Sequence, residues 1–372
     1  MTSRSPIKRR KQEHLDFCLR QPVEFQRKTT WLEHVELVHR AVPTVSPAEV
    51  DISVTLLGKR LEAPFIIGAM TGGTAEAGRI NRRLAEVAAE AGVGLALGSQ
   101  RAMLEQVSAE KTFRVRDVAP DILLLGNIGM AQAAESSAGA VKDLMKRVEA
   151  DGMNLHLNAA MELFQAGGDC DVGDVAGAVK RLARALGKKL IVKETGCGLS
   201  HETARELIEL GVGTLDVAGA GGTSWVRVEN LRRGGAPDGL GEFEEWGIPT
   251  AASLTEMRGL KATIIASGGI RSGVDLAKAI ALGAEVGSAA LPALRALHAG
   301  GKKGLAAWIE QLSSGLRTAL ALTGCSSLNE LRGAPVGLSG LMRRIPAIES
   351  LYRTLFSRSS RSGIQLLSGS RR

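Results

Sequence analysis

Short apolar runs recur along the chain from residue 63 onwards, and a glycine or polar cluster and then an amphipathic segment follow most of them. Runs that stay apolar without alternating are typical of parallel strands covered on both faces. The pattern therefore predicts a series of eight buried parallel strands. The runs occupy residues 63–70, 93–99, 122–129, 153–158, 190–195, 214–219, 262–269 and 284–290.

The segments between the runs have the apolar spacing of helices, as in 77–92, 176–189 and 200–211. Ser200 is a predicted N-cap and Gly211 a predicted helix end. Strand and helix units that alternate over about 230 residues predict an α/β fold, and a TIM (β/α)8 barrel in particular. A doubly wound sheet is the alternative.

Polar and glycine residues gather directly after the apolar runs, which places them at the carboxyl ends of the predicted strands. In a barrel this rim is where functional sites are built. Two segments on the rim, 159–174 and 219–249, are predicted as long loops. Loops of this length in a compact domain are usually functional, so we expect them to form lids or walls of a site.

Residues 1–62 precede the first predicted barrel strand and carry a basic segment near the start. Two interpretations remain open for this segment: an amphipathic leader helix, or a basic arm folded over the barrel mouth. No linker or low-complexity segment divides the rest. We therefore predict an N-terminal arm over 1–62 and one barrel domain over 63–372 that ends in a C-terminal helical tail.

Composition and charge narrow the class of protein. Apolar residues make up 44% of the chain and aromatic residues only 3%, which suits a globular α/β protein rich in glycine turns. The net charge of +8 is concentrated at the two ends, in 4–11 and 357–372, without interleaved aromatic residues. We therefore expect a phosphate-bearing small molecule as the partner and no nucleic acid.

The cysteines and the apolar segments indicate a cytoplasmic protein. Cys18, Cys170, Cys197 and Cys325 are far apart and form no CxxC pair, so neither a zinc site nor a disulfide framework is predicted. The basic N-terminus lacks the apolar stretch of a signal peptide, and no run is long enough to cross a membrane. We expect no membrane association.

A glycine pair and other small residues at the ends of the last two predicted strands indicate a phosphate site. In "ASGGIRSG" (266–273) and "GSAAL" (287–291), small residues at a strand end free backbone N–H groups to face an anion, and a helix begins directly afterwards. Tight turns for helix packing are the alternative. The predicted phosphate cradle comprises Gly268, Gly269, Ile270, Ala289 and Ala290.

Other strand ends carry side chains suited to a flat ring cofactor. Lys193 ends a strand inside the mouth, where its ammonium either stabilises charge on a reduced flavin or forms an ion pair with Glu194 or another carboxylate. Thr71, Ser99 and Asn127 follow the first three strands and offer hydrogen bonds beside small residues. This pattern favours a flavin held by its phosphate at the last two strands.

Basic and acidic side chains complete the predicted site. Arg101, His156 and Asn158 project from strand ends, and if the arm converges on them they gather donors around a diphosphate together with basic residues of the arm. Glu162 follows closely, and magnesium commonly binds through one carboxylate plus substrate phosphates. An ion pair between Glu162 and Arg101 or another basic residue of the rim is the alternative.

Taken together, these segments resemble the type 2, FMN-dependent isopentenyl diphosphate isomerases, which have a TIM barrel fold. The resemblance covers most of the chain, and the order of the motifs is more specific than any single one. Its motifs are "RKQEH" (10–14), "APFIIGAMTGG" (63–73), "GSQR" (98–101), "GNIG" (126–129), "LHLN" (155–158), "VKETGCGLS" (192–200), "DVAGAGGTSW" (216–225), "EWGIPTAASL" (245–254), "IIASGGIRSG" (264–273) and "LTGCSSLNELRG" (322–333).

The resemblance implies residue roles at matching positions. Substrate contacts fall on Arg10, Lys11, His14, Ser99, Gln100, Arg101, His156, Asn158 and Met161. FMN contacts fall on Ala69, Met70, Thr71, Ser99, Asn127, Lys193, Thr223, Gly268, Gly269, Ile270, Ala289 and Ala290, and the magnesium ligand is Glu162.

The implied reaction is a 1,3-allylic proton shift that interconverts isopentenyl and dimethylallyl diphosphate. Reduced FMN serves as acid and base in it, Mg2+ bridges the diphosphate, and NADPH reduces the flavin without being consumed in each turnover. The family also implies a homo-oligomer, either a tetramer or an octamer.

One position departs from the family pattern. Family members typically read "HLNxxQE", and the glutamine is thought to touch the substrate and take part in proton transfer, whereas this chain reads "HLNAAME". The thioether of Met161 donates no hydrogen bond and relays no proton. A flavin-dependent oxidoreductase on a related substrate, or a non-catalytic prenyl-diphosphate or flavin-binding homologue, therefore remains an alternative.

Overall fold

The structure is a computed structural model that describes residues 6–165, 168, 173–235 and 240–339. Its centre is a closed barrel of eight parallel strands in which the last strand pairs with the first. The predicted TIM barrel is confirmed, and each predicted run contains one strand. The strands are β4 (Phe65–Ile67), β5 (Gly94–Ala96), β6 (Leu124–Gly129), β7 (Gly152–His156), β8 (Leu190–Lys193), β9 (Thr214–Asp216), β10 (Thr263–Ser267) and β11 (Val286–Ala289).

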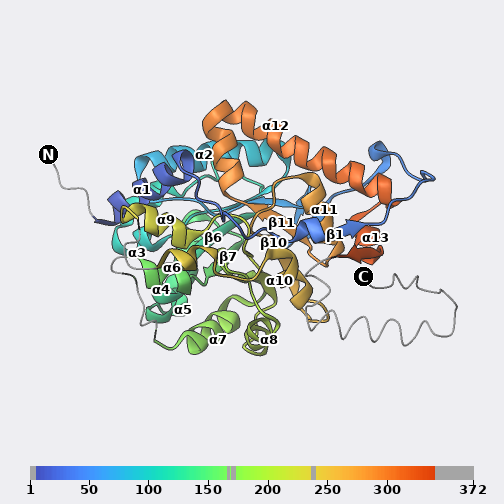
Figure 1. Ribbon diagram of the computed structural model, residues 1–372. Coiled ribbons are helices and arrows are strands. Elements are labelled where there is room, and N and C mark those ends of the chain that lie inside the picture. The colour runs from blue at the N-terminus through green and yellow to red at the C-terminus, as the bar shows by residue number, and fades with distance from the viewer. Residues whose placement is uncertain (1–5, 166–167, 169–172, 236–239, 340–372) are drawn as a thin grey trace.

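Helices surround the barrel, as Figure 1 shows. The predicted amphipathic segments form helices, and Ser200 caps α8 by accepting a bond from the Thr203 N–H. The bounds are α2 (Ala75–Ala91), α3 (Arg101–Glu105), α4 (Met130–Glu135), α5 (Ala138–Val148), α7 (Val175–Leu186), α8 (His201–Glu209), α10 (Thr250–Glu256), α11 (Gly273–Ala281), α12 (Leu291–Thr323) and α13 (Leu328–Gly333), with 3-10 turns η3 (Val107–Thr112) and η4 (Gly187–Lys189).

The segment before the barrel contains a helix and two small sheets. α1 (Pro6–Arg20) lies beside α9 (Trp225–Arg232) in Figure 1. Strands β2 (Val54–Leu56) and β3 (Lys59–Leu61) form a hairpin, and β1 (Val35–Leu37) pairs antiparallel with β12 (Val336–Leu338). The remaining turns are η1 (Leu32–His34) and η2 (Pro47–Glu49).

The inside of the barrel is apolar at its amino-terminal end. Leu56 and Leu61 of the hairpin pack with Ile66, Leu125 and Ile191 of the strands, so that the hairpin plugs this end. Apolar packing at one end leaves the carboxyl ends of the strands to form the cavity. The barrel is therefore a filled core with one functional rim.

The prediction of two long loops on the rim is wrong in part. The first segment begins with α6 (Ala159–Phe164), and the second contains α9 and η5 (Leu240–Glu245). α9 lacks an apolar stripe because its buried side includes Glu229 and Asn230. Both expected loops are therefore partly helical walls. Residues 340–372, which hold the end of the predicted C-terminal tail, lie outside the described residues, as does Cys170.

Candidate active site

A cavity of about 250 Å³ opens at the carboxyl ends of the barrel strands, and α1 of the N-terminal segment contributes to its wall. Almost every residue predicted for the site lines it. Those residues are Arg10, Lys11, His14, Ala69, Met70, Thr71, Ser99, Arg101, Asn127, His156, Asn158, Met161, Glu162, Lys193, Thr223, Gly268, Gly269, Ala289 and Ala290.

Two predicted residues do not line the cavity. Ile270 is completely buried in the apolar core. Gln100 is also completely buried, and its amide donates to the backbone oxygen of Leu144 at 3.2 Å. Its side-chain oxygen accepts the backbone N–H of Asn127 at 3.0 Å. Gln100 therefore fixes the strand that presents Asn127 to the cavity.

Three cationic side chains converge where α1 meets the rim. The Lys11 ammonium donates to the Ser99 carbonyl at 3.1 Å and lies 5.6 Å from the centre of the Phe113 ring. Burial, and then the nearby charge of Arg10, lower the pKa of Lys11 to about 8. Burial and repulsion by Arg101 likewise lower the pKa of Arg10. Clustered cations of this kind are stabilised by a polyanion.

His14 is fixed to α9 by a buried ion-pair network. Its Nε2 lies 2.7 Å from the carboxylate of Glu229, which is completely buried and also pairs with Arg232. Arg232 in turn pairs with Glu13 at 3.0 Å. Burial lowers the pKa of His14, although Glu229 acts in the opposite direction. A neutral His14 that donates to Glu229 thus holds α1 against α9.

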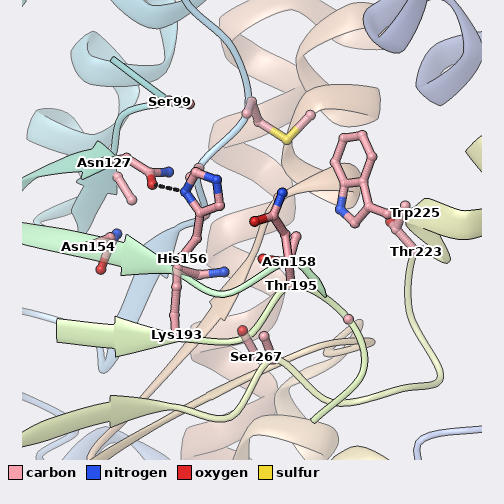
Figure 2. Close-up of a pocket in the computed structure, with 18 of the residues that line it drawn as sticks. Ser99, Asn127, Asn154, His156, Asn158, Lys193, Thr195, Thr223, Trp225 and Ser267 are labelled. Atoms are coloured by element: carbon pink, nitrogen blue, oxygen red, sulfur yellow. Dashed lines mark hydrogen bonds between the residues drawn. The ribbon is translucent and has the colours of Figure 1, made fainter. Parts of the chain in front are cut away.

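His156 presents a neutral imidazole to the cavity. Figure 2 shows its ring between Asn127 and Asn158, with the Nδ1 atom 2.7 Å from the side-chain oxygen of Asn127. A carboxamide oxygen only accepts, so Nδ1 carries the proton and Nε2 is left as an acceptor. Burial, and then the charge of Lys193, lower the pKa of His156 to about 3. His156 therefore offers the cavity a neutral hydrogen-bond acceptor and not a cation.

Lys193 does not form the alternative ion pair with the Glu194 carboxylate. Its ammonium donates to the backbone oxygen of Glu194 at 2.5 Å, whereas the carboxylate accepts backbone N–H groups of Thr195 and Cys197. Burial raises the pKa of Glu194 to about 7. The Lys193 side chain lines the cavity, as the flavin interpretation requires.

The glycine turn after β10 has the conformation that a phosphate cradle needs. Gly268 and Gly269 have positive φ angles of 93° and 79°. A Cβ atom on Gly268 would lie 2.0 Å from the carbonyl oxygen of Gly219. The turn leads to α11, whose first turn is capped by Ser272 and Asp275. Only glycine fits here, and the backbone can approach an anion closely.

Glu162 is held between two amide side chains. Asn158 donates to one carboxylate oxygen at 2.7 Å, and Gln165 donates to the other at 3.0 Å. Within the described residues, no group of three or more His, Cys, Asp or Glu side chains is arranged to hold a metal ion. A cation at Glu162 would therefore need further oxygen ligands from a bound substrate.

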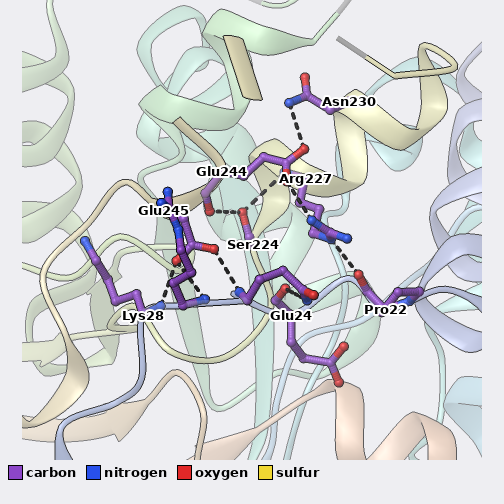
Figure 3. Close-up of polar contacts among 10 residues, drawn as sticks. Pro22, Glu24, Lys28, Ser224, Arg227, Asn230, Glu244 and Glu245 are labelled. Carbon is purple, nitrogen blue, oxygen red and sulfur yellow. Dashed lines mark hydrogen bonds and ion pairs between the residues drawn. The ribbon is translucent and has the colours of Figure 1, made fainter. Parts of the chain in front are cut away.

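Hydrogen bonds fasten the segment that follows α1 to the second rim wall (Figure 3). The Glu245 carboxylate accepts the backbone N–H groups of Gln26, Arg27 and Lys28. Arg227 donates to the Pro22 carbonyl at 2.6 Å. We call residues 21–31 the strap. It also pairs with the turn that carries Thr223, through the bridge between Glu24 and Thr223.

The structure adds site residues that the sequence did not single out. Arg271 lines the cavity directly after the glycine turn, and Trp225 begins α9 with its ring 5.4 Å from that of His14. Both residues fall within motifs quoted from the sequence. Arg271 follows "GGI" and Trp225 follows "GTS", and this proximity to glycine turns of the rim could have indicated that they line the site. The others of note are Gln132, Asn154, Gln165, Thr195, Asp216, Ser267 and Ser288.

Comparison with known proteins identifies the class first. A family model described as FMN-dependent dehydrogenase matches residues 3–156 and 174–337, so the chain belongs to that family. A solved structure of a mandelate oxidase variant with a C4a-OH-FMN adduct superposes with a TM-score of 0.62. It shares 19% sequence identity and covers 88% of this chain and 95% of its own. At this identity, the likeness shows the fold alone.

The particular family follows from closer relatives. An isopentenyl-diphosphate delta-isomerase of Methanosarcina barkeri is 42% identical over 90% of this chain and 93% of its own. One of Mycolicibacterium gilvum is 42% identical over 88% of this chain and 96% of its own, and one of Methanothermobacter thermautotrophicus is 43% identical over 90% and 94%. The chain belongs to the FMN-dependent, type 2 isopentenyl-diphosphate delta-isomerase family.

Proposed function

We propose that this enzyme interconverts isopentenyl and dimethylallyl diphosphate by a 1,3-allylic proton shift. The observation that carries the proposal is that one cavity holds two separate groups suited to anions. One is the positive-φ turn at Gly268 and Gly269, and the other is the cluster of Arg10, Lys11 and Arg101. FMN brings one phosphate and a prenyl diphosphate brings the second anion. The names of the relatives favour the same pair of ligands.

The FMN site fits the residues present. The glycine turn would hold the phosphate together with Ala289 at the end of β11 and Ala290 at the N-cap of α12, with Ile270 directly after the turn. Ala69, Met70, Thr71, Ser99, Asn127, Lys193 and Thr223 surround the ring and its chain. When bound and reduced, FMN supplies an electron-rich ring that stabilises positive charge on an alkene and exchanges a proton with it. The proposed reductant is NADPH, consumed only to activate the cofactor.

The residues of the chain bind and orient the substrate. Arg10, Lys11 and Arg101 neutralise the diphosphate, and His14 keeps α1 in place through Glu229. Neutral His156 and the amide of Asn158 line the cavity and position the prenyl group against the ring. Ser99 contacts both ligands, while Gln100 acts through Asn127. Met161 lines the same wall and contributes apolar contact only.

We propose that Glu162 would hold a magnesium ion, which would take the substrate diphosphate as a further ligand. The single carboxylate fits this role because magnesium usually keeps waters and takes phosphate oxygens as its other ligands. The cation also offsets negative charge that the basic cluster leaves uncompensated. Removing Mg2+ with a chelator is expected to weaken diphosphate binding and leave FMN bound.

The test of the proposal is conversion of isopentenyl diphosphate by the FMN-loaded, reduced protein with Mg2+. Formation of dimethylallyl diphosphate supports the isomerase. Binding of the diphosphate without conversion contradicts it and favours a non-catalytic homologue. Met161 is the observation that favours a second candidate, an oxidoreductase on a related substrate, because this wall of the cavity lacks the proton-relaying amide.

We also propose that the protein is a homo-oligomer, a tetramer or an octamer, as the family implies. Light scattering of the FMN-loaded protein tests this directly, and a monomeric mass contradicts it.

Among the helices of the described residues, none combines the length and the apolar character that a membrane span needs.

A further inference from the structure

Gln165 lies at the end of the short helix that carries Glu162, and nothing in the proposed reaction has yet used it. Its side chain is only 5% exposed and lines the cavity. Its amide nitrogen donates to the Glu162 carboxylate at 3.0 Å. Across the described part of the chain, no hydrogen bond reaches its side-chain oxygen. A side chain at the cavity wall whose amide nitrogen is committed to Glu162 is placed to act on that carboxylate.

Asn158 and Gln165 lie at helical spacing on either side of Glu162 in the sequence. Asn158 precedes Glu162 by four positions and Gln165 follows it by three, so both amides lie on the same helical face as the carboxylate. Each amide takes a different carboxylate oxygen. The two bonds fix the plane and the rotamer of Glu162 more firmly than either bond alone.

The backbone holds Gln165 in this place. Its own N–H donates to the Met161 carbonyl at 2.9 Å, and its carbonyl accepts the N–H of Gly168 at 2.9 Å. A Cβ atom on Gly168 would lie 2.0 Å from the backbone oxygen of Glu162. Gly168 therefore lies close to the backbone of Glu162, and two hydrogen bonds fix the backbone of Gln165 beside the carboxylate.

We propose that Gln165 is a positioning residue that orients the Glu162 carboxylate, together with Asn158, for a divalent cation shared with the bound diphosphate. The inference rests on the proposed function of Glu162. Groups that hold a metal-ligating carboxylate contribute strongly to affinity, and their loss typically weakens metal binding by about 10- to 100-fold. With a hydrated cation bound, the side-chain oxygen of Gln165 would be available to accept a hydrogen bond from one of its waters.

The test measures Mg2+ dependence of inorganic diphosphate binding to the FMN-loaded protein by calorimetry. In Gln165→Met, which keeps length but loses the amide, the Mg2+ midpoint is expected to rise about 10- to 100-fold. FMN affinity stays within about twofold, because Gln165 does not belong to the proposed FMN contacts. Saturating Mg2+ restores most of the turnover rate. Gln311→Met, at an exposed glutamine of α12, is the matched control and keeps the wild-type midpoint.

A second pair of variants separates this inference from the proposed function. Gln165→Asn retains an amide on a side chain that is too short to reach Glu162. It replaces Gln165→Met in the Mg2+ titration if Gln165→Met fails to retain FMN. Glu162→Gln is expected to abolish the Mg2+ dependence. A wild-type midpoint in both Gln165 variants, with the dependence lost in Glu162→Gln, overturns the positioning role alone. Unchanged Mg2+ dependence in Glu162→Gln overturns the metal assignment and the positioning role with it.

Discussion

At the scale of single residues, the site is dominated by three cationic side chains that fold close together, and their burial and mutual repulsion lower the pKa values of Arg10 and Lys11. The Lys11 ammonium is held by a carbonyl and an aromatic ring while Arg10 and Arg101 repel it. Such an arrangement costs stability in the free protein, and a bound polyanion relieves the cost. Binding and charge state are therefore linked at this position.

Diphosphate affinity is expected to fall as pH rises through the Lys11 pKa of about 8. Below that value the ammonium is charged and attracts the ligand. At one unit above it, only about a tenth of Lys11 is charged, so binding weakens by up to about tenfold. Calorimetric titration of inorganic diphosphate between pH 7 and 9.5 measures this. Lys11→Arg stays charged throughout this range, so its pH profile shows the titration of the diphosphate alone. Equal pH profiles for the two proteins contradict the claim that titration of Lys11 weakens binding.

Met161 allows a direct test of how the proton moves. If the protein residues at this wall relay protons, Met161→Gln is expected to raise kcat by about tenfold or more, the usual scale of acid–base assistance. Near equality assigns proton transfer to the cofactor. Met161→Leu, which is also apolar, is the control for packing. Steady-state rates with isopentenyl diphosphate distinguish proton relay by this wall from proton transfer by the cofactor. A loss of activity in Met161→Gln contradicts both explanations.

At the scale of elements, the turn after β10 and the strap carry the most specific geometry. The turn was visible in the sequence because glycine pairs at a strand end have few other uses. The strap was not visible, because its bonds to Glu245 are made by backbone N–H groups, which leave no mark on residue type. The same reason hid α9: its buried Glu229 finds its partner His14 215 residues away.

Gly268→Ala is expected to abolish most FMN binding. An added Cβ collides with the Gly219 carbonyl, and the positive φ adds strain, so the turn has to move away from the phosphate. Fluorescence titration of FMN measures the loss. Gly259→Ala is the matched control, since Gly259 also has a positive φ, of 82°, but nothing lies within 4 Å of its Cβ position. It is expected to lower stability by about 1 kcal/mol with FMN affinity unchanged.

Glu245→Ala is expected to release the strap. The change removes the acceptor for three backbone N–H groups and lowers the free energy of unfolding by about 2 kcal/mol. Hydrogen exchange at Gln26, Arg27 and Lys28 measures the release locally. Glu242→Ala, an exposed residue of the same 3-10 turn, serves as control. Equal exchange rates in the two variants contradict the role of Glu245.

At the scale of the whole molecule, the barrel followed from the sequence and the closure of the site did not. Continuous apolar runs such as the one that contains β6 are buried on both faces, which indicates parallel strands, and eight strand–helix units favour the barrel over a doubly wound sheet. The cavity, however, combines the barrel rim with α1, and that long-range contact depends on polar partners such as Glu229 and Arg232. The convergence of the basic arm was therefore only a hypothesis until the structure placed it.

Arg10→Ala combined with Lys11→Ala tests the arm as a substrate-binding unit without removing the helix. Two charge-assisted contacts are lost, which is expected to weaken diphosphate binding by about 100-fold or more. FMN affinity and the unfolding transition should change little, because neither side chain belongs to the proposed FMN contacts. Diphosphate binding by calorimetry that matches the unsubstituted protein excludes the arm from the site.

The most direct test of the central claim is the ratio of product formed to NADPH consumed. The FMN-loaded protein is reduced under anaerobic conditions and supplied with isopentenyl diphosphate and Mg2+, and dimethylallyl diphosphate and NADPH are followed together. An isomerase that uses the reduced cofactor as acid and base forms many molecules of product for each NADPH oxidised. One product molecule per NADPH, or NADPH oxidation without dimethylallyl diphosphate, contradicts the account.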